Sequence, residues 1–103
     1  MTTIKSSMSD RHYIIELKGH ADSAEYGKDL VCCAESMLIF TLMSYLEKQA
    51  DRGRILGYQS HAEDGYIRME CDLIDNSVGE GIEAIEEGFK LLVEKYEKYI
   101  KFI

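Results

Sequence analysis

A histidine and a cysteine near the N-terminus are residue types that nucleophilic catalysis uses. His20 stands in Gly-His-Ala at 19–21, and Cys32 ends the run Gly-Lys-Asp-Leu-Val-Cys at 27–32. A thiolate attacks carbonyl groups, and an adjacent imidazole can accept the thiol proton. If Asp29 caps a helix, Cys32 lies in the first turn, where unpaired amides and the helix dipole stabilise a thiolate. The pair is a candidate hydrolytic site, with packing of Cys32 in the core as the alternative.

The remaining cysteines and histidines carry weaker signals. Cys33 is rotated about 100° around the helix from Cys32, so we predict that it packs in the core. Cys71 shares an apolar strand face and is also expected in the core. His12 and His61 border turns and are expected on the surface. Because these residues lack the spacing of metal ligands, we predict no metal and no cofactor.

Hydrophobic periodicity predicts two β-hairpins, each followed by a helix. Residues 4–8 and 13–19 form the first hairpin, and residues 55–62 and 66–74 form the second around an Asp-Gly turn. The order ββαββα predicts an α+β fold, in which an antiparallel sheet packs against two helices.

The two helices differ in their patterns. Residues 29–49 form a helix capped by Asp29 that is apolar on several sides, which predicts burial all round, with Met37 and Phe40 in the core. The second helix begins at a capping box over 77–80, and its apolar residues recur every three or four positions. One face of the second helix therefore packs, and the other faces water.

The segment at 20–28 has no hydrophobic periodicity and lies between Gly19 and Gly27. Glycines allow a backbone to turn at low cost. We therefore predict a mobile loop that joins His20 to the helix of Cys32 and borders any groove between them.

Composition and charge narrow the class of protein. The 103 residues are 46% hydrophobic and include no proline, which predicts one globular domain over 1–103 and excludes disorder. The net charge is −7, and nine acidic residues lie between Glu63 and Glu87 with Arg68 as the only basic one. This charge repels nucleic acid and favours a basic partner.

Location is predicted from three further features. Three cysteines without spaced pairs do not make a disulfide framework, which predicts reduced thiols in the cytoplasm. The first residues lack the apolar segment of a signal peptide. The most apolar run, 30–46, is short for a membrane span and contains Glu35 and Ser36, so we predict a buried helix and no membrane contact.

The motif residues resemble the ribosomal-processing cysteine protease family, whose members are small bacterial proteins. The family carries Gly-His-Ala, a loop, then Gly-Lys-Asp-aliphatic-Val-Cys-Ala and a serine one turn later; here the motif spans 19–36. Length and the expected element order also match. The resemblance implies a cytoplasmic endopeptidase that removes a short N-terminal extension from a large-subunit ribosomal protein, and it implies a homodimer.

The same resemblance implies roles for individual residues. Cys32 is the nucleophile, His20 is the general base, and Asp29 and Ser36 support them. The implied substrate-binding loop contains Gly19, Ala21, Tyr26, Gly27 and Lys28. Two residues depart from the family pattern. Cys33 replaces an alanine, which is also small, so this change is expected to be harmless. Glu35 replaces a small or apolar residue and adds a charge near the nucleophile, which leaves the fine substrate preference open.

Two other readings of the chain remain. In the first, the protein is a non-catalytic ribosome-assembly or interaction module, with Cys32 inert in the core and an acidic face that docks a basic partner. In the second, Cys32 and Cys33 form a redox switch, which is disfavoured because a disulfide between neighbours would be strained in a helix. The rate of thiol alkylation distinguishes the protease from the module.

Overall fold

The structure is a computed structural model that describes residues 1–19 and 26–103, and it leaves out the side chains of 26–29. The elements in chain order are β1 (Thr2–Ser9), β2 (His12–Lys18), α1 (Tyr26–Asp51), β3 (Ile55–Glu63), β4 (Tyr66–Leu73), α2 (Ser77–Lys95) and β5 (Ile100–Phe102). The α+β fold and the order ββαββα are confirmed, and a fifth strand follows the second helix.

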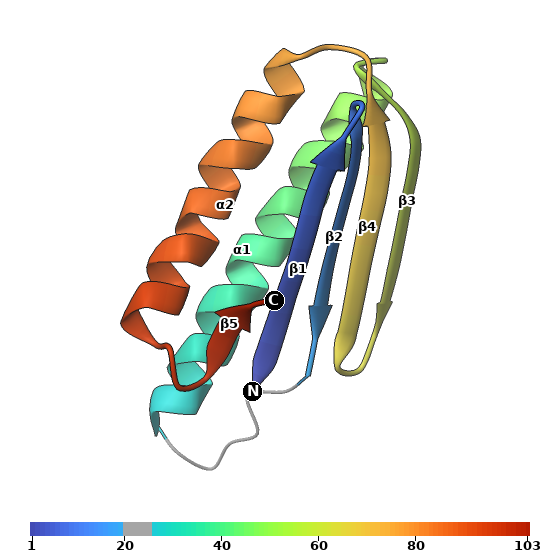
Figure 1. The fold of residues 1–103 in the computed structure, drawn as a ribbon. Coiled ribbons are helices and arrows are strands. Elements are labelled where there is room, and N and C mark those ends of the chain that lie inside the picture. Colours follow the sequence, from blue (N-terminus) through green and yellow to red (C-terminus); the bar gives the residue numbers. More distant parts are fainter. Residues whose placement is uncertain (20–25) are drawn as a thin grey trace.

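The five strands form one sheet in the order β3-β4-β2-β1-β5. Neighbouring strands are antiparallel except β5, which pairs parallel with β1, so the sheet is mixed and the expected all-antiparallel sheet is wrong at this edge. Figure 1 shows both helices on one face of the sheet, with the other face uncovered. The core therefore lies between the helices and one sheet face.

Both predicted hairpins are present. In the first, Asp10 and Arg11 adopt positive φ values of 49° and 68°, which closes a two-residue turn between β1 and β2. In the second, Gly65 has a φ of 76° in the two-residue turn between β3 and β4. The alternation predicted for these strands also holds. The residues of β2 and β4 that face the helices and are buried are Tyr13, Ile15, Leu17, Met69, Cys71 and Leu73.

Helix α1 packs by one face only. Its buried residues include Val31, Ile39 and Leu42, whereas Met37 is 67% exposed and Phe40 is 53% exposed. The prediction of a helix buried on all sides, with Met37 and Phe40 in the core, is therefore wrong. The sheet and α2 both contact α1 from one side, so its outward face is left uncovered. By length and composition alone, this apolar helix could cross a membrane.

Helix α2 begins without the predicted capping box. Asn76 is the N-cap, has helical φ and ψ, and makes no side-chain capping bond. The backbone N–H of Ser77 instead donates to Oδ1 of Asp75 at 2.9 Å, and this bond lowers the pKa of the Asp75 carboxyl. The capping box does not form because Ser77 is the first residue of the helix and not its N-cap. The carboxylate of Asp75, before the helix, accepts a hydrogen bond from a helix-start N–H in its place.

Candidate active site

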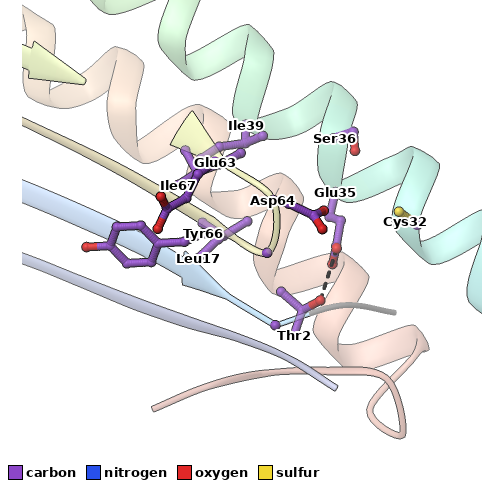
Figure 2. Close-up of a pocket in the computed structure, with 12 residues that line it drawn as sticks. Thr2, Leu17, Cys32, Glu35, Ser36, Ile39, Glu63, Asp64, Tyr66 and Ile67 are labelled. Carbon is purple, nitrogen blue, oxygen red and sulfur yellow. Dashed lines mark hydrogen bonds between the residues drawn. The ribbon is translucent and has the colours of Figure 1, made fainter. Parts of the chain in front are cut away.

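A pocket of about 240 Å³ is lined by the N-terminal part of α1, the β3–β4 turn and residues of β1 and β2. Figure 2 shows the side chains that line it. Helix α1 contributes Cys32, Glu35, Ser36 and Ile39, the β3–β4 hairpin contributes Glu63, Asp64, Gly65, Tyr66 and Ile67, and β1 and β2 with the residue after them contribute Thr2, Leu17 and Gly19. The pocket thus gathers residues from four segments that are distant in sequence.

Cys32 is the one cysteine on the pocket wall. Its thiol is free and exposed, and Ser36 lies one helical turn further along the same wall. Cys33 is free and exposed as well, so its predicted place in the core is wrong, because the outward face of α1 is uncovered. Cys71 is buried as predicted, and burial raises the pKa of its thiol to about 11. The accessible thiol that faces a cavity is therefore that of Cys32.

The start of α1 differs from the prediction in a way that matters for the thiol. The helix begins at Tyr26, so Asp29 is inside it and is not the N-cap. Only the first turn of a helix has unpaired amide groups, and Cys32, the seventh residue of α1, lies beyond that turn. The prediction that unpaired amides at the helix start stabilise the Cys32 thiolate is therefore wrong. The helix dipole does not replace them, because its effect also fades after the first turn. Gly27 has a low helix propensity, and this is why local sequence placed the helix start after it.

Gly19 holds the chain at the edge of the pocket. Its φ is 103°, and its N–H donates to the carbonyl oxygen of Gly65 at 2.9 Å. A Cβ at this position would lie 2.2 Å from the carbonyl oxygen of Met1, so no residue larger than glycine fits without a shift of the backbone. His20 is the next residue in the sequence.

The other predicted loop residues divide into two groups. His20 and Ala21 lie outside the described residues. Tyr26, Gly27 and Lys28 belong to α1, so the prediction that they form part of a loop is wrong. The side chain of Asp29 is also outside the described part, and its supporting role stays a prediction.

Glu35 is a pocket residue whose position the sequence analysis did not predict. It is 8% exposed, and its Oε1 accepts a hydrogen bond from the hydroxyl of Thr2 at 3.0 Å, drawn as a dashed line in Figure 2. Its Oε2 is buried and has no hydrogen-bond partner among the described residues. Burial raises the pKa of the Glu35 carboxyl. A spacing of four from Val31 and from Ile39, both buried, could have placed Glu35 on the buried face of the helix.

The pocket has a negative electrostatic character. Glu63 and Asp64, at the tip of the hairpin, join Glu35 among the lining residues, and no described lining residue is basic. Among the described residues, those of the pocket included, no group of three His, Cys, Asp or Glu side chains could hold a metal ion. The chemistry available in the pocket is therefore that of one thiol, the hydroxyls of Thr2, Ser36 and Tyr66, and carboxyl groups.

Neither described histidine lines this pocket. His12 lies on the uncovered face of the sheet, 2.7 Å from Asp72 and 3.3 Å from Glu70, and these carboxylates raise the pKa of its imidazole. His61 is exposed on β3 and is 3.4 Å from Glu63. Both lie on the surface, as predicted. A histidine partner for Cys32 would therefore have to be His20.

Comparisons with known proteins agree with this geometry. The family model described as Cysteine protease Prp matches residues 1–101. The crystal structure of SMU.848 from Streptococcus mutans is similar at 32% identity and a TM-score of 0.68, covering 100% of this chain and 94% of that one. Among curated proteins, none matches this chain.

Two further similar structures are of an essential ribosomal processing protease, Prp, from S. aureus. The complex with a substrate peptide is 19% identical, has a TM-score of 0.72, and covers 100% of this chain and 98% of the other. The complex with a covalently linked product peptide is 20% identical, has a TM-score of 0.77, and covers 99% and 97%. At these identities the likeness shows that the fold is shared.

Proposed function

Since the chain belongs to the cysteine protease Prp family and is a cysteine protease, we propose that it removes a short N-terminal extension from a large-subunit ribosomal protein during ribosome maturation. The observation that carries the proposal is the exposed thiol of Cys32 on the wall of a pocket, one turn from Ser36 and opposite the β3–β4 turn. The S. aureus protein of the same fold is a ribosomal processing protease whose structure holds a substrate peptide.

In the proposed reaction, Cys32 is the nucleophile and His20 is the general base. The imidazole takes the thiol proton, Sγ attacks the carbonyl carbon of the scissile peptide bond, and an S–C bond forms. The imidazolium then protonates the leaving nitrogen as the C–N bond breaks, which leaves the N-terminal extension as a thioester on Cys32. Water, activated by the same imidazole, hydrolyses the thioester and restores the thiol.

The choice of His20 rests on position and on elimination. Gly19 lies at the edge of the pocket that Cys32 lines, and its backbone is held there by the hydrogen bond to Gly65. His12 and His61, the two described histidines, line other surfaces. Because Cys32 is beyond the first turn of α1, His20 also replaces the helix start as the source of thiolate stabilisation.

Ser36 and the hairpin tip have supporting roles in this proposal. Ser36 lies on the same wall as Cys32 and can hydrogen-bond the backbone of an extended peptide. Glu63 and Asp64 make the pocket negative, which favours a basic peptide segment over nucleic acid. The exposed thiol argues against a module in which Cys32 is inert in the core. The adjacency of Cys32 and Cys33 within one continuous helix argues against a redox switch.

We place the enzyme in the cytoplasm as a homodimer. The described cysteines are free, which fits a reducing compartment. The outward face of α1 exposes Met37 and Phe40, and the neighbouring α2 exposes Leu91 at 65%. A second copy placed symmetrically on this face would cover the apolar side chains of both molecules.

The mass measured by light scattering tests the dimer. Phe40→Glu is expected to give a monomer, and Gln59→Glu, on the exposed surface of β3, is the control that remains dimeric. A wild-type chain that is monomeric at assay concentrations would contradict the dimer.

The protease function is tested with the extended ribosomal protein from the same organism. We expect incubation with the purified enzyme to shorten that protein by its N-terminal extension, which intact-mass spectrometry detects. A mature protein that carries no extension is the control and is expected to keep its mass. An extended protein whose mass is unchanged after long incubation with folded enzyme would contradict the proposal.

A further inference from the structure

Strand β1 is paired along only part of its outer edge. At its start, the N–H of Thr2 donates to the carbonyl oxygen of Tyr99 at 2.9 Å. Two residues later, the carbonyl oxygen of Ile4 accepts from the N–H of Ile103 at 2.8 Å. Figure 1 shows that β5 ends well before the far end of β1. The second half of β1, up to Ser9, is therefore an open edge of the sheet.

The open edge presents backbone groups that can pair with another strand. In an antiparallel pair, the backbone groups of successive residues point alternately toward the partner strand and away from it. Because Thr2 and Ile4 bond outward, Ser6 and Met8 also direct their N–H and C=O groups outward. Among the described residues, neither Ser6 nor Met8 has a backbone partner on that side. Another strand can therefore join the sheet here, where β5 ends.

The opposite edge of the sheet is less suited to such pairing. The pairing of β3 with β4 shifts between Leu56 and Gln59, and Gly57 within this irregularity has a φ of 63°. Irregularities of this kind bend a strand and hinder the addition of another one. Strand β1 keeps one register with β2 from Thr3 to Ser9, without a shift. Of the two edges, that of β1 therefore fits a partner strand better.

A groove of about 460 Å³ lies beside the open edge of β1. Ser6, Ser7, Met8 and Tyr13 line it from the sheet, and α2 forms the facing wall. The hydroxyl groups of Ser6 and Tyr13 donate to the carboxylate of Glu86, which joins the two walls. A strand that pairs with β1 directs every second side chain toward α2. The groove therefore offers main-chain partners on one side and room for side chains on the other.

The α2 wall of this groove is acidic. Glu80, Glu83 and Glu86 line it, and the one basic residue among the described lining residues is Lys90, which is 3.3 Å from Glu87. Glu80 and Glu83 are exposed. They are about 5 Å apart along the helix axis, and alternate side chains of an extended strand are about 7 Å apart. Lysine or arginine side chains two positions apart can therefore reach both carboxylates.

The groove is remote from the active-site pocket. Thr2 lines that pocket together with Cys32. Ser6 and Met8 follow Thr2 by four and six residues, which is about 13 and 20 Å along an extended strand. A segment that pairs with β1 is therefore distinct from the residues around the scissile bond, and it belongs to a substrate long enough to reach both places.

Resting on the proposed protease function, we propose that the open edge of β1 and the acidic wall of α2 bind an extended basic segment of the ribosomal protein substrate, away from the bond that is cleaved. The main chain of the segment pairs with Ser6 and Met8, and its cationic side chains contact Glu80 and Glu83. This surface raises the affinity for the whole protein and leaves the chemistry at Cys32 unchanged.

Two substrates test the acidic wall. One is the extended ribosomal protein, and the other is a peptide with about four residues, at most about 14 Å, on each side of the cleaved bond. The double variant Glu80→Gln, Glu83→Gln is expected to raise KM for the protein about tenfold, as for the loss of two exposed ion pairs. Its kcat/KM for the peptide should equal that of wild type, because the peptide does not reach the groove.

A matched double variant controls for general charge effects. Glu87→Gln, Glu94→Gln removes two exposed carboxylates from the same helix outside the groove lining, and it is expected to keep the wild-type KM for the protein. Raising the salt concentration should raise the wild-type KM for the protein, because the ion pairs are exposed. Equal KM values for the protein in wild type and Glu80→Gln, Glu83→Gln would overturn the inference.

The main-chain pairing is tested at Met8. Met8→Pro removes the outward N–H at an edge position, where proline is tolerated, and Met8→Ala is the control that keeps this N–H. We expect only Met8→Pro to raise KM for the protein, with cleavage of the short peptide showing that the variant is folded. Hydrogen exchange gives a second readout in Cys32→Ala, where binding of the extended protein should protect the amides of Ser6 and Met8. Unchanged exchange at both amides would overturn the pairing.

Binding separates this inference from the proposed function. The fluorescently labelled extended protein is titrated with Cys32→Ala, with and without Glu80→Gln, Glu83→Gln, and its anisotropy is measured. Weaker binding by the charge variant, without hydrolysis by wild type, would overturn the proposed function and support the docking surface. Hydrolysis by wild type with equal binding by both proteins would do the reverse. A lower mass of Met8→Pro in light scattering would assign the edge to a second copy of this chain and overturn the inference.

Discussion

The hydroxyl of Thr2 donates a 3.0 Å hydrogen bond to Oε1 of Glu35, which ties the first residue of β1 to the pocket wall of α1. Both residues are buried, and they are 33 positions apart in sequence. This bond joins the N-terminal strand to the helix that carries Cys32. The start of the chain therefore helps to fix the distance between the sheet end and the proposed nucleophile.

The two adjacent thiols are expected to differ completely in function. Cys32→Ala should abolish cleavage of the extended ribosomal protein, because the nucleophile is lost, and alanine keeps the helix intact. Cys33→Ala should retain most activity, because Cys33 is exposed and lies outside the pocket lining. Rates of cleavage by both variants check this. An active Cys32→Ala together with an inactive Cys33→Ala would move the nucleophile to the other sulfur.

His20 is expected to control the reactivity of the Cys32 thiol. His20→Ala should slow alkylation of Cys32 at and below neutral pH, since the thiolate loses its imidazolium partner, and should lower kcat by at least about a hundredfold. Alkylation is measured against pH in a Cys33→Ser background, so that one exposed thiol reacts. Cys71 is buried and serves as the slow internal reference. An unchanged pH profile with unchanged turnover would remove His20 from the mechanism.

Glu35 is expected to lower stability at neutral pH. Because burial raises the pKa of the Glu35 carboxyl in the folded state, the folded protein binds this proton more tightly than the unfolded chain does. The protonated carboxyl therefore adds to the free energy of unfolding in full below the unfolded pKa of 4.5, and this addition is lost as pH rises through the folded pKa. Glu35→Gln should therefore be more stable than wild type at pH 7, by about 1 kcal/mol or more. Urea denaturation at pH 7 and pH 4 measures the gain.

The gain from Glu35→Gln should shrink at the lower pH, where wild type also carries a neutral group. Glu47→Gln, at an exposed site on the same helix, should change stability little at either pH. A destabilised Glu35→Gln at pH 7 would show that the carboxylate is well paired in the folded protein.

Gly19 should tolerate no side chain. Gly19→Ala places a Cβ 2.2 Å from the carbonyl oxygen of Met1 at a φ of 103°, so it should lower the free energy of unfolding by about 2 kcal/mol or more and reduce activity. Gly53→Ala is the matched control, because Gly53 has a φ of 70° with no atom within 4 Å of the added Cβ, and should cost about 1 kcal/mol. Equal losses would show that the contact with Met1 is easily relaxed.

Local patterns predicted the hairpins well and the edges of the fold poorly. Tyr13, Ile15 and Leu17 alternate along β2, and a strand with one buried face requires this period, so the pattern identifies the face. Strand β5 has three residues and forms by pairing with β1 almost a full chain length away. No short window of sequence contains that pairing, so local patterns do not predict β5.

The candidate site shows the same limit. The motif at 19–36 located Cys32, Ser36 and Gly19, which do line one pocket. Whether an apolar helix is covered on one side or on several depends on how many elements pack against it, so Met37 and Phe40 could not be placed from periodicity. The hairpin tip at Glu63 and Asp64 reaches the pocket only through the tertiary fold. The burial of Glu35 could be predicted from its spacing of four from Val31 and Ile39, although its charge alone favours an exposed position.

The central claim is that the thiol of Cys32 attacks the peptide bond of the substrate, and trapping the intermediate tests it most directly. The enzyme is mixed with the extended ribosomal protein, quenched in acid at short times, and analysed by intact-mass and fragment mass spectrometry. We predict a species whose added mass equals the acyl group of the N-terminal extension, attached as a thioester to Cys32 and absent from Cys32→Ala. A thioester on Cys33, or cleavage that proceeds unchanged in Cys32→Ala, would contradict the account.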